Sequence, residues 1–247
     1  MSDSLKFDIC CAARILYRAG LSVANAGHLS VAIGNDRMLV NRFGPSFATL
    51  VPADILTVSF DGKILEGEGW VNDTIALHGV IHRENPNITA VAHTHPPASV
   101  TWSAFRKVPE IFDQESCITA GDIGVVDEDY EGLATGDRNL PLAHKLGEKP
   151  IAILPNHGVV TTGPNIQLAT VRMMLVEGAC ARNISVAAAA RATGLTPQPI
   201  KPEHALTAKN EIAKIPLLQP LWTDLLTRLR QSDPDLFAAS SQVAIRS

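Results

Sequence analysis

The spacing of apolar residues changes along the chain, and this change predicts a mixture of helices and strands. Residues 9–19 carry apolar side chains at helical spacing and are followed by a glycine, which predicts a helix. The stretches 29–33 and 38–41 are strand-like and are joined by a Gly-Asn-Asp turn. A second hairpin is predicted from 56–60 and 63–65 around an Asp-Gly turn. The first quarter of the chain is therefore expected to form a helix followed by antiparallel strands.

The next segment predicts a helix that leads into a buried strand. Asp73 or Thr74 is placed to cap a helix that carries apolar residues and two histidines over 75–82. Pro86 is expected to end this helix, because proline cannot continue one. The apolar run 88–92 then predicts a buried strand.

Beyond that strand, the pattern predicts a long loop between further helices and strands. The stretch 117–141 is rich in Gly, Asp and Thr and lacks periodicity, which is typical of loops near a site. The other predicted elements are helices at 99–107, 141–146 and 166–190 and strands at 151–154 and 159–163.

Length and composition favour one large domain with a helical tail. The chain has 247 residues and is 46% hydrophobic, which is ample for a substantial core. We assign residues 1–195 to one α/β domain. Residues 196–247 begin with a proline-rich linker and carry helical spacing at 203–213 and 217–229. This tail is expected to pack on the domain or on a neighbouring subunit.

Charge and cysteine content exclude several classes of protein. The net charge is −4 and the 21 Lys and Arg residues are scattered, so nucleic-acid binding is not expected. No apolar run approaches the roughly 20 residues of a membrane span, and the N-terminal residues do not resemble a signal peptide, which together predict a cytoplasmic protein. The four cysteines lack CxxC spacing, and we expect them to be reduced core residues.

Three histidines stand where predicted strands leave the core. His93 and His95 end the first buried strand, and side chains two apart on a strand point to the same side. His157 follows the apolar run 151–154 and precedes Gly158, where the backbone is expected to turn. Any one of these histidines alone is more often a core or surface residue. Three neutral imidazoles at strand ends instead predict a divalent metal site with an open face, as in a catalytic centre.

Several separated motifs occur in an order that resembles the class II aldolase/adducin family over residues 8–190. The motifs are Gly27-His28-Leu29-Ser30, Asn41-Arg42-Phe43-Gly44, the helix with His78, His93-Thr94-His95, and Asn156-His157-Gly158 with Gly163. The resemblance implies a three-layer α/β/α fold with a central, largely antiparallel sheet. It also implies a homo-oligomer, with a tetramer favoured and sites near subunit interfaces. By the same resemblance, His93, His95 and His157 are the metal ligands.

Where the chain departs from that family, it departs from the sugar-phosphate aldolases. Those enzymes carry Ser-Ser-Glu four residues ahead of the helix histidine, whereas this chain has Asn72-Asp73-Thr74. Asp73 would repel a phosphate dianion, and Thr74 cannot act as a carboxylate base. The aldolases also have Gly-Asn where this chain has Gly27-His28, and they supply an acidic tyrosine that is missing here. A sugar-phosphate substrate is therefore disfavoured.

These substitutions resemble the branch of the family that decarboxylates ortho-hydroxylated aromatic or heteroaromatic acids. The hydroxyl and carboxylate of such a substrate would chelate the ion, which would take up electron density as CO2 leaves. An acid of the protein would then protonate the ring carbon. The sequence does not choose among Mn, Zn, Fe and Co for the ion.

The candidate proton donors are Asp73 and His78, because both lie at the start of the helix that leads to the metal-binding strand. Asp73 as a simple helix cap is an equal alternative. His82 shares a helix face with His78 but stands beside an Arg-Glu pair, so we expect it to be solvated. His144 and His204 lie in charged helical segments and are expected at the surface.

Three residues are candidates for substrate binding. His28 follows a glycine in the first hairpin, and Arg42 is suited to a carboxylate, although a local acid is an equal partner for it. Tyr130 lies in the long loop and could cover the pocket or simply pack within the loop.

Other functions remain open on the sequence. An aldolase that acts on a non-phosphorylated hydroxy-keto acid shares the metal chemistry. An adducin-like scaffold shares the fold, although the retained histidines favour an enzyme. An Fe(II) oxygenase is a third alternative, because three histidines also suit that metal.

Overall fold

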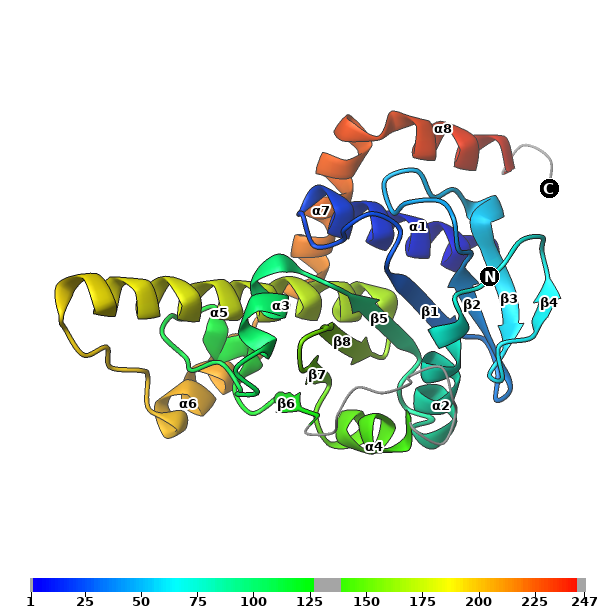
Figure 1. Ribbon diagram of the computed structural model, residues 1–247. Coiled ribbons are helices and arrows are strands. Elements are labelled where there is room, and N and C mark those ends of the chain that lie inside the picture. Colours follow the sequence, from blue (N-terminus) through cyan, green and yellow to red (C-terminus); the bar gives the residue numbers. More distant parts are fainter. Residues whose placement is uncertain (1, 127–138, 244–247) are drawn as a thin grey trace.

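The computed structural model describes residues 2–126 and 139–243. These residues form an eight-stranded sheet with helices on both faces (Figure 1). The strand order is β4-β3-β2-β1-β5-β8-β7-β6. Every neighbouring pair is antiparallel except β6 and β7. The structure thus confirms the expected α/β/α layering and the largely antiparallel sheet.

The first four strands form the two predicted hairpins. β1 (His28–Ala32) pairs with β2 (Arg37–Asn41), and β3 (Ile55–Ser59) pairs with β4 (Ile64–Glu66). β2 and β3 also pair, so the four strands are continuous in the sheet. Each strand lies within one residue of its predicted position at both ends.

The second half of the sheet contains one strand that the sequence pattern did not predict. β5 (Ala90–Thr94) lies between β1 and β8 (Gly158–Gly163), and β7 (Ile151–Leu154) follows β8 in the sheet. β6 (Ile123–Val125) pairs in parallel with β7 at the edge. It lies inside the stretch predicted as loop, and that prediction was wrong here because a three-residue strand with a central glycine gives no alternation.

Two helices cover one face of the sheet. α1 (Ser2–Arg18) and the long α5 (Ile166–Thr193) both contribute to the largest core cluster. Leu29, Ala92 and Ile153 supply this cluster from the strands, in keeping with the alternation of side chains along a strand. Figure 1 shows α5 running past the end of the sheet, beyond the strands that it covers.

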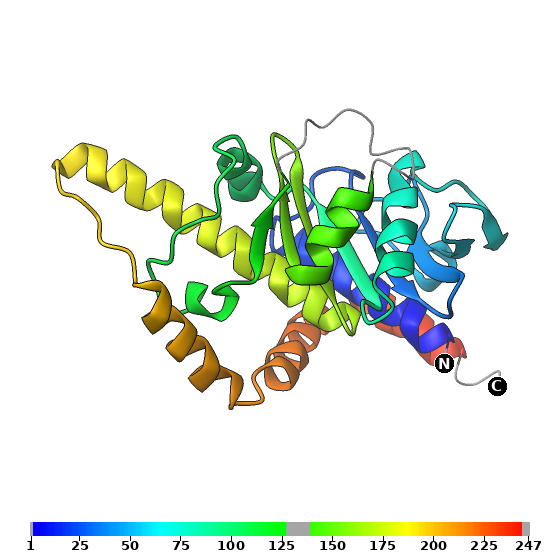
Figure 2. The ribbon, with the colours of Figure 1, turned by 90° about the horizontal axis from the view of Figure 1, so that it is seen from below.

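Two shorter helices cover the opposite face, which Figure 2 shows nearer the viewer. α2 (Ala76–Glu84) and α4 (Leu140–Glu148) pack on Val91 and Val160, which alternate with the residues of the first face. A short 3-10 turn, η2 (Asp73–Ile75), precedes α2.

α2 lies very close to the sheet because it carries a glycine where it crosses the end of β3. A Cβ atom on Gly79 would come within 1.7 Å of the Phe60 carbonyl oxygen. This approach requires glycine, because any side chain would move the helix away. Gly79 therefore fixes the depth at which the neighbouring histidines of α2 enter the sheet face.

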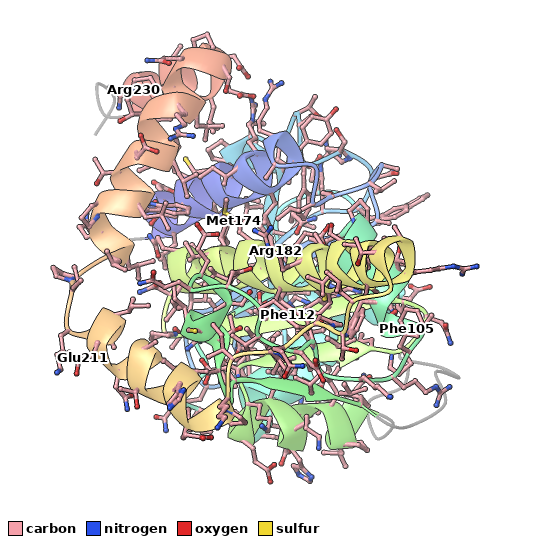
Figure 3. The ribbon with its side chains drawn as sticks, turned by 90° about the vertical axis from the view of Figure 1, so that its left-hand side faces the viewer. Phe105, Phe112, Met174, Arg182, Glu211 and Arg230 are labelled. Atoms are coloured by element: carbon pink, nitrogen blue, oxygen red, sulfur yellow. The ribbon has the colours of Figure 1, made fainter. Side chains whose placement is uncertain are left out.

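The segment after β5 is held against α5. α3 (Pro97–Ser103) starts two residues before its predicted position, and a further 3-10 turn, η3 (Ser116–Thr119), follows at the end of the segment. Between them, Asp113 Oδ2 accepts a hydrogen bond of 2.8 Å from Arg182 Nε of α5. Figure 3 labels Arg182 and Phe112 and shows this segment beside the helix.

The described part of the tail, up to residue 243, forms three helices, of which the last was not predicted. α6 (Pro202–Ala213) packs on η3, and α7 (Leu218–Ser232) and α8 (Pro234–Val243) reach α1. Trp222 of α7 and Leu236 of α8 are buried in the same core cluster as α1 and α5. The tail thus contributes apolar side chains to the core of its own chain.

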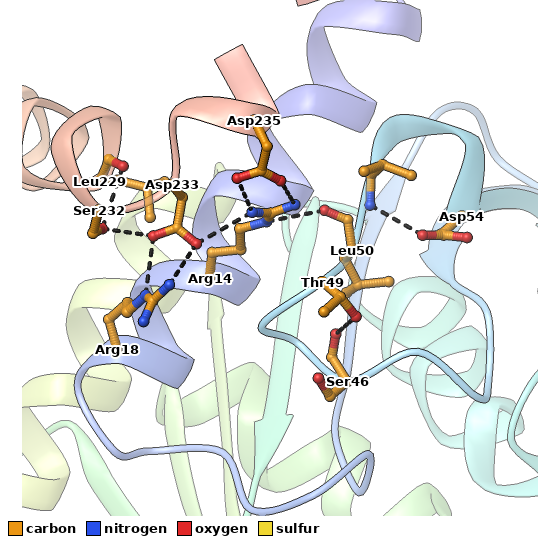
Figure 4. Close-up of polar contacts among 11 residues, drawn as sticks. Arg14, Arg18, Ser46, Thr49, Leu50, Asp54, Leu229, Ser232, Asp233 and Asp235 are labelled. Carbon is orange, nitrogen blue, oxygen red and sulfur yellow. Dashed lines mark hydrogen bonds and ion pairs between the residues drawn. The ribbon is translucent and has the colours of Figure 1, made fainter. Parts of the chain in front are cut away.

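A charged network joins α1 to the junction of α7 and α8 (Figure 4). Arg14 is 2% exposed, and it contacts Asp233 at 3.2 Å and Asp235 at 2.8 Å. Its Nε donates to the Leu50 carbonyl at 3.1 Å. Arg18 donates two further hydrogen bonds of 3.0 Å to Asp233. We call these four charged side chains the tail anchor.

Two composition-based expectations can be compared with the structure. All four cysteines are buried and free, as expected of reduced core residues. In the described parts of the chain, no helix combines the length and the apolar character that crossing a membrane would require.

Candidate metal centre

The three predicted ligands come together at one end of the sheet. His93 is the fourth residue of β5, and His95 follows the end of that strand on the same side. His157 lies in the turn between β7 and β8, where Asn156 adopts a positive φ of 56° that asparagine tolerates better than most residues. A Cβ on Gly158 would lie 2.5 Å from the Thr94 carbonyl oxygen. The glycine therefore allows this turn to approach the end of β5.

The Nε2 atoms of the three imidazoles converge on one point. His95 Nε2 lies 3.2 Å from His93 Nε2 and 2.7 Å from His157 Nε2. Ligands of one tetrahedral ion, at about 2.1 Å from it, are roughly 3.4 Å apart, so the first separation matches and the second is somewhat shorter. Across the described ranges, this is the group of His, Cys, Asp or Glu residues whose atoms are close enough to hold a metal ion.

The surroundings direct the ligand atoms toward the shared point. His93 Nδ1 lies 3.0 Å from the Val159 carbonyl oxygen, which can only accept, so this nitrogen carries the hydrogen. The lone pair of a neutral His93 is therefore on Nε2, as a metal ligand requires. The donor set and its orientation thus fit a divalent ion held by His93, His95 and His157.

Burial keeps these imidazoles uncharged. Desolvation lowers the pKa of His93 well below its usual value, and the neighbouring histidines lower it further. Burial and the nearby His95 lower the pKa of His157 to about 4, and burial alone lowers that of His95. All three are neutral at pH 7, which is the form that binds metal.

His28 lies beside this cluster and links two of the departures from the aldolase pattern. It pairs with His93 in the ladder between β1 and β5, and the two rings are 4.9 Å apart. Its Nε2 lies 3.0 Å from the Thr74 hydroxyl oxygen. The imidazole that replaces asparagine and the threonine that replaces glutamate are therefore hydrogen-bonded partners. Burial lowers the pKa of His28 to about 3.

Two expectations about the α2 region were wrong. His82 is not solvated: it is 3% exposed and its Nδ1 lies 2.9 Å from the Ile88 carbonyl oxygen. The expectation rested on the charged residues beside His82 in the sequence, but His82 lies on the face of α2 that packs against the sheet. The helix cap is also neither Asp73 nor Thr74, because the Asn72 side chain accepts the hydrogen bond from Thr74 N at 2.9 Å. Asn72 has the side chain and the extended backbone of an N-cap.

The other candidate residues differ in how exposed they are and in what they contact. Asp73 is exposed at the start of η2, next to Thr74. His78 is fully buried, and its Nε2 contacts His28 Nδ1 at 2.7 Å. Arg42 is 38% exposed and pairs with Asp54 at 2.7 Å, the local partner that the sequence left open. Tyr130 lies outside the described residues.

Two further residues near the site were missed by sequence reasoning. Ser30 is fully buried on β1, two residues after His28, and contacts both histidines of α2. Glu177 of α5 accepts hydrogen bonds from the backbone of Ala98 and Ser99, at the start of the helix that follows His95. Ser30 stood in a quoted motif, whereas Glu177 gave no signal because its partners are 78 and 79 positions away.

Comparisons with known proteins agree with this geometry. Residues 7–184 match the model of the Class II Aldolase and Adducin N-terminal domain. The decarboxylase NovR of Streptomyces niveus is 31% identical over 243 residues, covering 94% of this chain and 86% of its own length. The 3,4-dihydroxyphthalate decarboxylase of Arthrobacter keyseri is 28% identical over 196 residues, with 73% and 78% covered. A crystal structure of an aldolase II superfamily protein from Pseudomonas syringae superposes with a TM-score of 0.84, at 25% identity and 95% coverage of both chains.

Proposed function

Because the chain belongs to the class II aldolase and adducin family, we propose that it is a metal-dependent decarboxylase of ortho-hydroxylated aromatic or heteroaromatic acids. The family's aldolases and the relatives named as decarboxylases both cleave carbon–carbon bonds, and the chain is a carbon–carbon lyase of this kind. What the proposal adds is the choice between the two reactions and the class of substrate.

One contact supports decarboxylation over aldol cleavage, namely the hydrogen bond between His28 Nε2 and the Thr74 hydroxyl. An aldol reaction of the family type uses a carboxylate base at the position of Thr74, and a threonine hydroxyl cannot replace it. A neutral imidazole lies there instead, beside the three ligands. Loss of CO2 needs no base to abstract a proton. It needs a group that stabilises the electrons left behind and an acid that then protonates the ring carbon.

The described residues divide the work as follows. His93, His95 and His157 would hold the divalent ion, which when bound supplies a Lewis acid for the electrons released with CO2. His28 would contact the substrate from the side of β1. We assign proton donation to Asp73, which is exposed at the start of η2, because His78 is fully buried and contacts His28.

Two further roles follow the sequence hypotheses. Arg42 would attract the substrate carboxylate, although its ion pair with Asp54 means that only part of its guanidinium is free to do so. Tyr130, which lies outside the described residues, would cover the substrate, as the sequence hypothesis has it. The ion would be Mn, Zn, Fe or Co, and the protein would work in the cytoplasm as a homo-oligomer, with four copies favoured.

The test is CO2 release from a panel of ortho-hydroxylated benzene and pyridine carboxylates that includes 3,4-dihydroxyphthalate. Metal-free protein is reconstituted separately with each of the four metals, and pyruvate is measured in parallel with hydroxy-keto acids as substrates. We expect metal-dependent CO2 without pyruvate. Pyruvate without CO2 would assign the chain to the aldolases, and dioxygen consumption coupled to turnover would assign it to the oxygenases. If neither CO2 nor pyruvate forms from any substrate, the proposal is contradicted and the scaffold alternative applies.

A further inference from the structure

A continuous row of hydrogen bonds runs behind His28, between β1 and α2. His28 Nδ1 lies 2.7 Å from His78 Nε2, and His78 Nδ1 lies 2.6 Å from Ser30 Oγ. The same hydroxyl lies 2.8 Å from His82 Nε2, and His82 Nδ1 lies 2.9 Å from the Ile88 carbonyl oxygen. All four side chains are at most 4% exposed. We call them the histidine–serine chain.

The carbonyl at the far end determines where the first hydrogens lie. A carbonyl oxygen can only accept, so His82 Nδ1 carries a hydrogen and donates it to Ile88. In a neutral imidazole the other nitrogen then has the lone pair. His82 Nε2 must therefore accept from the Ser30 hydroxyl.

The remaining hydrogens follow from the serine. Ser30 has one hydroxyl hydrogen, and it is used toward His82, so the oxygen accepts from His78 Nδ1. A neutral His78 then has its lone pair on Nε2, which accepts from His28 Nδ1. His28 is left with the lone pair of Nε2 directed to Thr74. One carbonyl group thus fixes three tautomers.

The opposite arrangement, in which His28 carries its hydrogen on Nε2, requires a buried cation. If His78 carried hydrogens on both nitrogens, it would donate to His28 as well as to Ser30, and His28 would then carry its hydrogen on Nε2. His78 is fully buried, and no carboxylate of residues 2–126 or 139–243 forms an ion pair with it. An unpaired buried charge is strongly disfavoured. Burial also lowers the pKa of both His78 and His82.

The near end of the row contains one hydrogen for two acceptors. The Thr74 hydroxyl lies 3.0 Å from His28 Nε2 and 2.8 Å from Asn72 Oδ1. It can donate to only one of them at a time. When it donates to Asn72, the lone pair of His28 Nε2 is left to accept from another donor. The far end, a carbonyl, cannot release or take up a proton, so the row orients hydrogens and does not conduct them.

We propose that Ser30 and His82 are positioning residues that act through His78 to hold His28 with its hydrogen on Nδ1 and the lone pair of Nε2 available to a hydroxyl group of the substrate. The tautomers are a property of the folded chain alone. The binding of a substrate hydroxyl by His28 rests on the proposed function, because an ortho-hydroxylated acid carries that donor next to its carboxylate.

The tautomers can be measured without substrate or metal. Full-length, metal-free protein with 15N-labelled imidazoles is studied by long-range proton–nitrogen correlation at pH 7.5, with signals assigned from single histidine variants. We expect His28, His78 and His82 each to show a protonated Nδ1 and an unprotonated Nε2. A His78 protonated at both nitrogens, or a His28 protonated at Nε2, would overturn the inference. Where a histidine variant fails to fold, the ring signals of that histidine are assigned through correlations to its own backbone, so the wild-type spectrum still decides the tautomers.

Matched serine variants test the positioning role. Ser30→Ala removes the acceptor of His78 Nδ1, and we expect mixed tautomers at His78 and His28 with exposed His144 and His204 unchanged. Ser22→Ala is the control, because its buried hydroxyl has no hydrogen-bond partner among the described residues. It should keep the wild-type spectrum. Ser30→Ala with wild-type tautomers would exclude Ser30 as a positioning residue.

Turnover then tests whether the lone pair of His28 Nε2 serves the reaction. On the substrate identified by CO2 release, Ser30→Ala should lower kcat by about ten-fold while bound metal per chain stays at the wild-type value, because a supporting residue orients a group that it does not replace. Unchanged kcat would contradict the role of the lone pair. If no substrate releases CO2, the proposed function fails, and the spectrum still decides the tautomers separately.

Discussion

Two buried polar regions of this chain use opposite chemistry, and the difference shows what each is for. In the tail anchor, Arg14 and Asp233 are each 2% exposed, both are charged, and each has two partners of the opposite charge. In the histidine cluster His93 is buried and His95 and His157 are half-buried, but the imidazoles are neutral and direct lone pairs to a common point. The anchor is complete without a ligand, whereas the cluster has ligand atoms that only a cation can satisfy together.

The comparison predicts that a change in either region affects one property and spares the other. Loss of a cluster residue should remove metal and turnover while the fold persists. Loss of an anchor residue should lower stability while the metal site persists.

Removal of one ligand should have the largest effect. His95→Ala leaves two imidazoles, and we expect loss of bound metal and a fall in turnover by about three orders of magnitude or more, because metal catalysis supplies several kcal/mol. Elemental analysis of the purified variant and CO2 release measure the two quantities. The circular dichroism spectrum should stay that of the wild type. His204→Ala, on the exposed face of α6, is the control. Wild-type activity in His95→Ala would refute the metal centre.

Removal of one anchor residue should be costly in stability only. Asp233→Ala leaves Arg14 buried without one of its two carboxylate partners, the one that is itself buried, and breaking a buried pair costs about 3–5 kcal/mol of unfolding free energy. Urea titration measures this loss, and metal content per folded chain should be unchanged. Asp224→Ala breaks the exposed pair with Arg228 in α7 and should cost about 0.5 kcal/mol or less. Equal losses in the two variants would show that the anchor does not hold the tail.

Acidification should destabilise the metal-free protein through its buried histidines. Burial lowers the pKa of His82 from 6.5 to about 4, so the unfolded state binds the additional proton between these values. The corresponding stability is present above pH 6.5 and is lost as pH falls toward 4. Between pH 7.5 and 5 this one residue accounts for about 2 kcal/mol. Urea titrations at pH 7.5 and pH 5 measure the loss. A free energy of unfolding that does not change over this range would contradict the neutral state of buried His82.

Thr74→Ala should have the smallest effect. The threonine contributes one hydrogen bond to His28 and has no role as a base, so turnover should fall by less than about ten-fold, in line with roughly 1 kcal/mol for one hydrogen bond. Steady-state CO2 release measures this change. A loss of several orders of magnitude would show that proton transfer passes through this position, as in an aldolase.

The sequence predicted most of the fold because its strands alternate and its turns carry the expected residues. β6 escaped because Ile123-Gly124-Val125 is too short to alternate, and its place depends on pairing with β7, 26 or more residues later. α8 escaped because its burial depends on α1, at the other end of the chain. Both elements are set by distant contacts that a local pattern does not record.

The meeting of His93, His95 and His157 was predictable because all three lie at strand ends, whereas the residues behind them were not. Helical spacing placed His78 and His82 on one face, but the charged neighbours of His82 suggested solvent. The depth of α2 depends on Gly79 against Phe60, and this close approach buries both histidines. Spacing thus predicted which residues share a face, and packing decided what that face meets.

If the three-histidine centre drives decarboxylation, CO2 release must depend on metal occupancy, and measuring the two together tests this dependence. Metal-free protein is titrated with the most effective metal on the best substrate of the panel, and CO2 and bound metal are measured in the same samples. CO2 release should rise in proportion to bound metal, saturate at one ion per chain, and be absent from His95→Ala. CO2 release that is independent of metal, or its absence from the fully loaded wild-type protein, would contradict a decarboxylation driven by this centre.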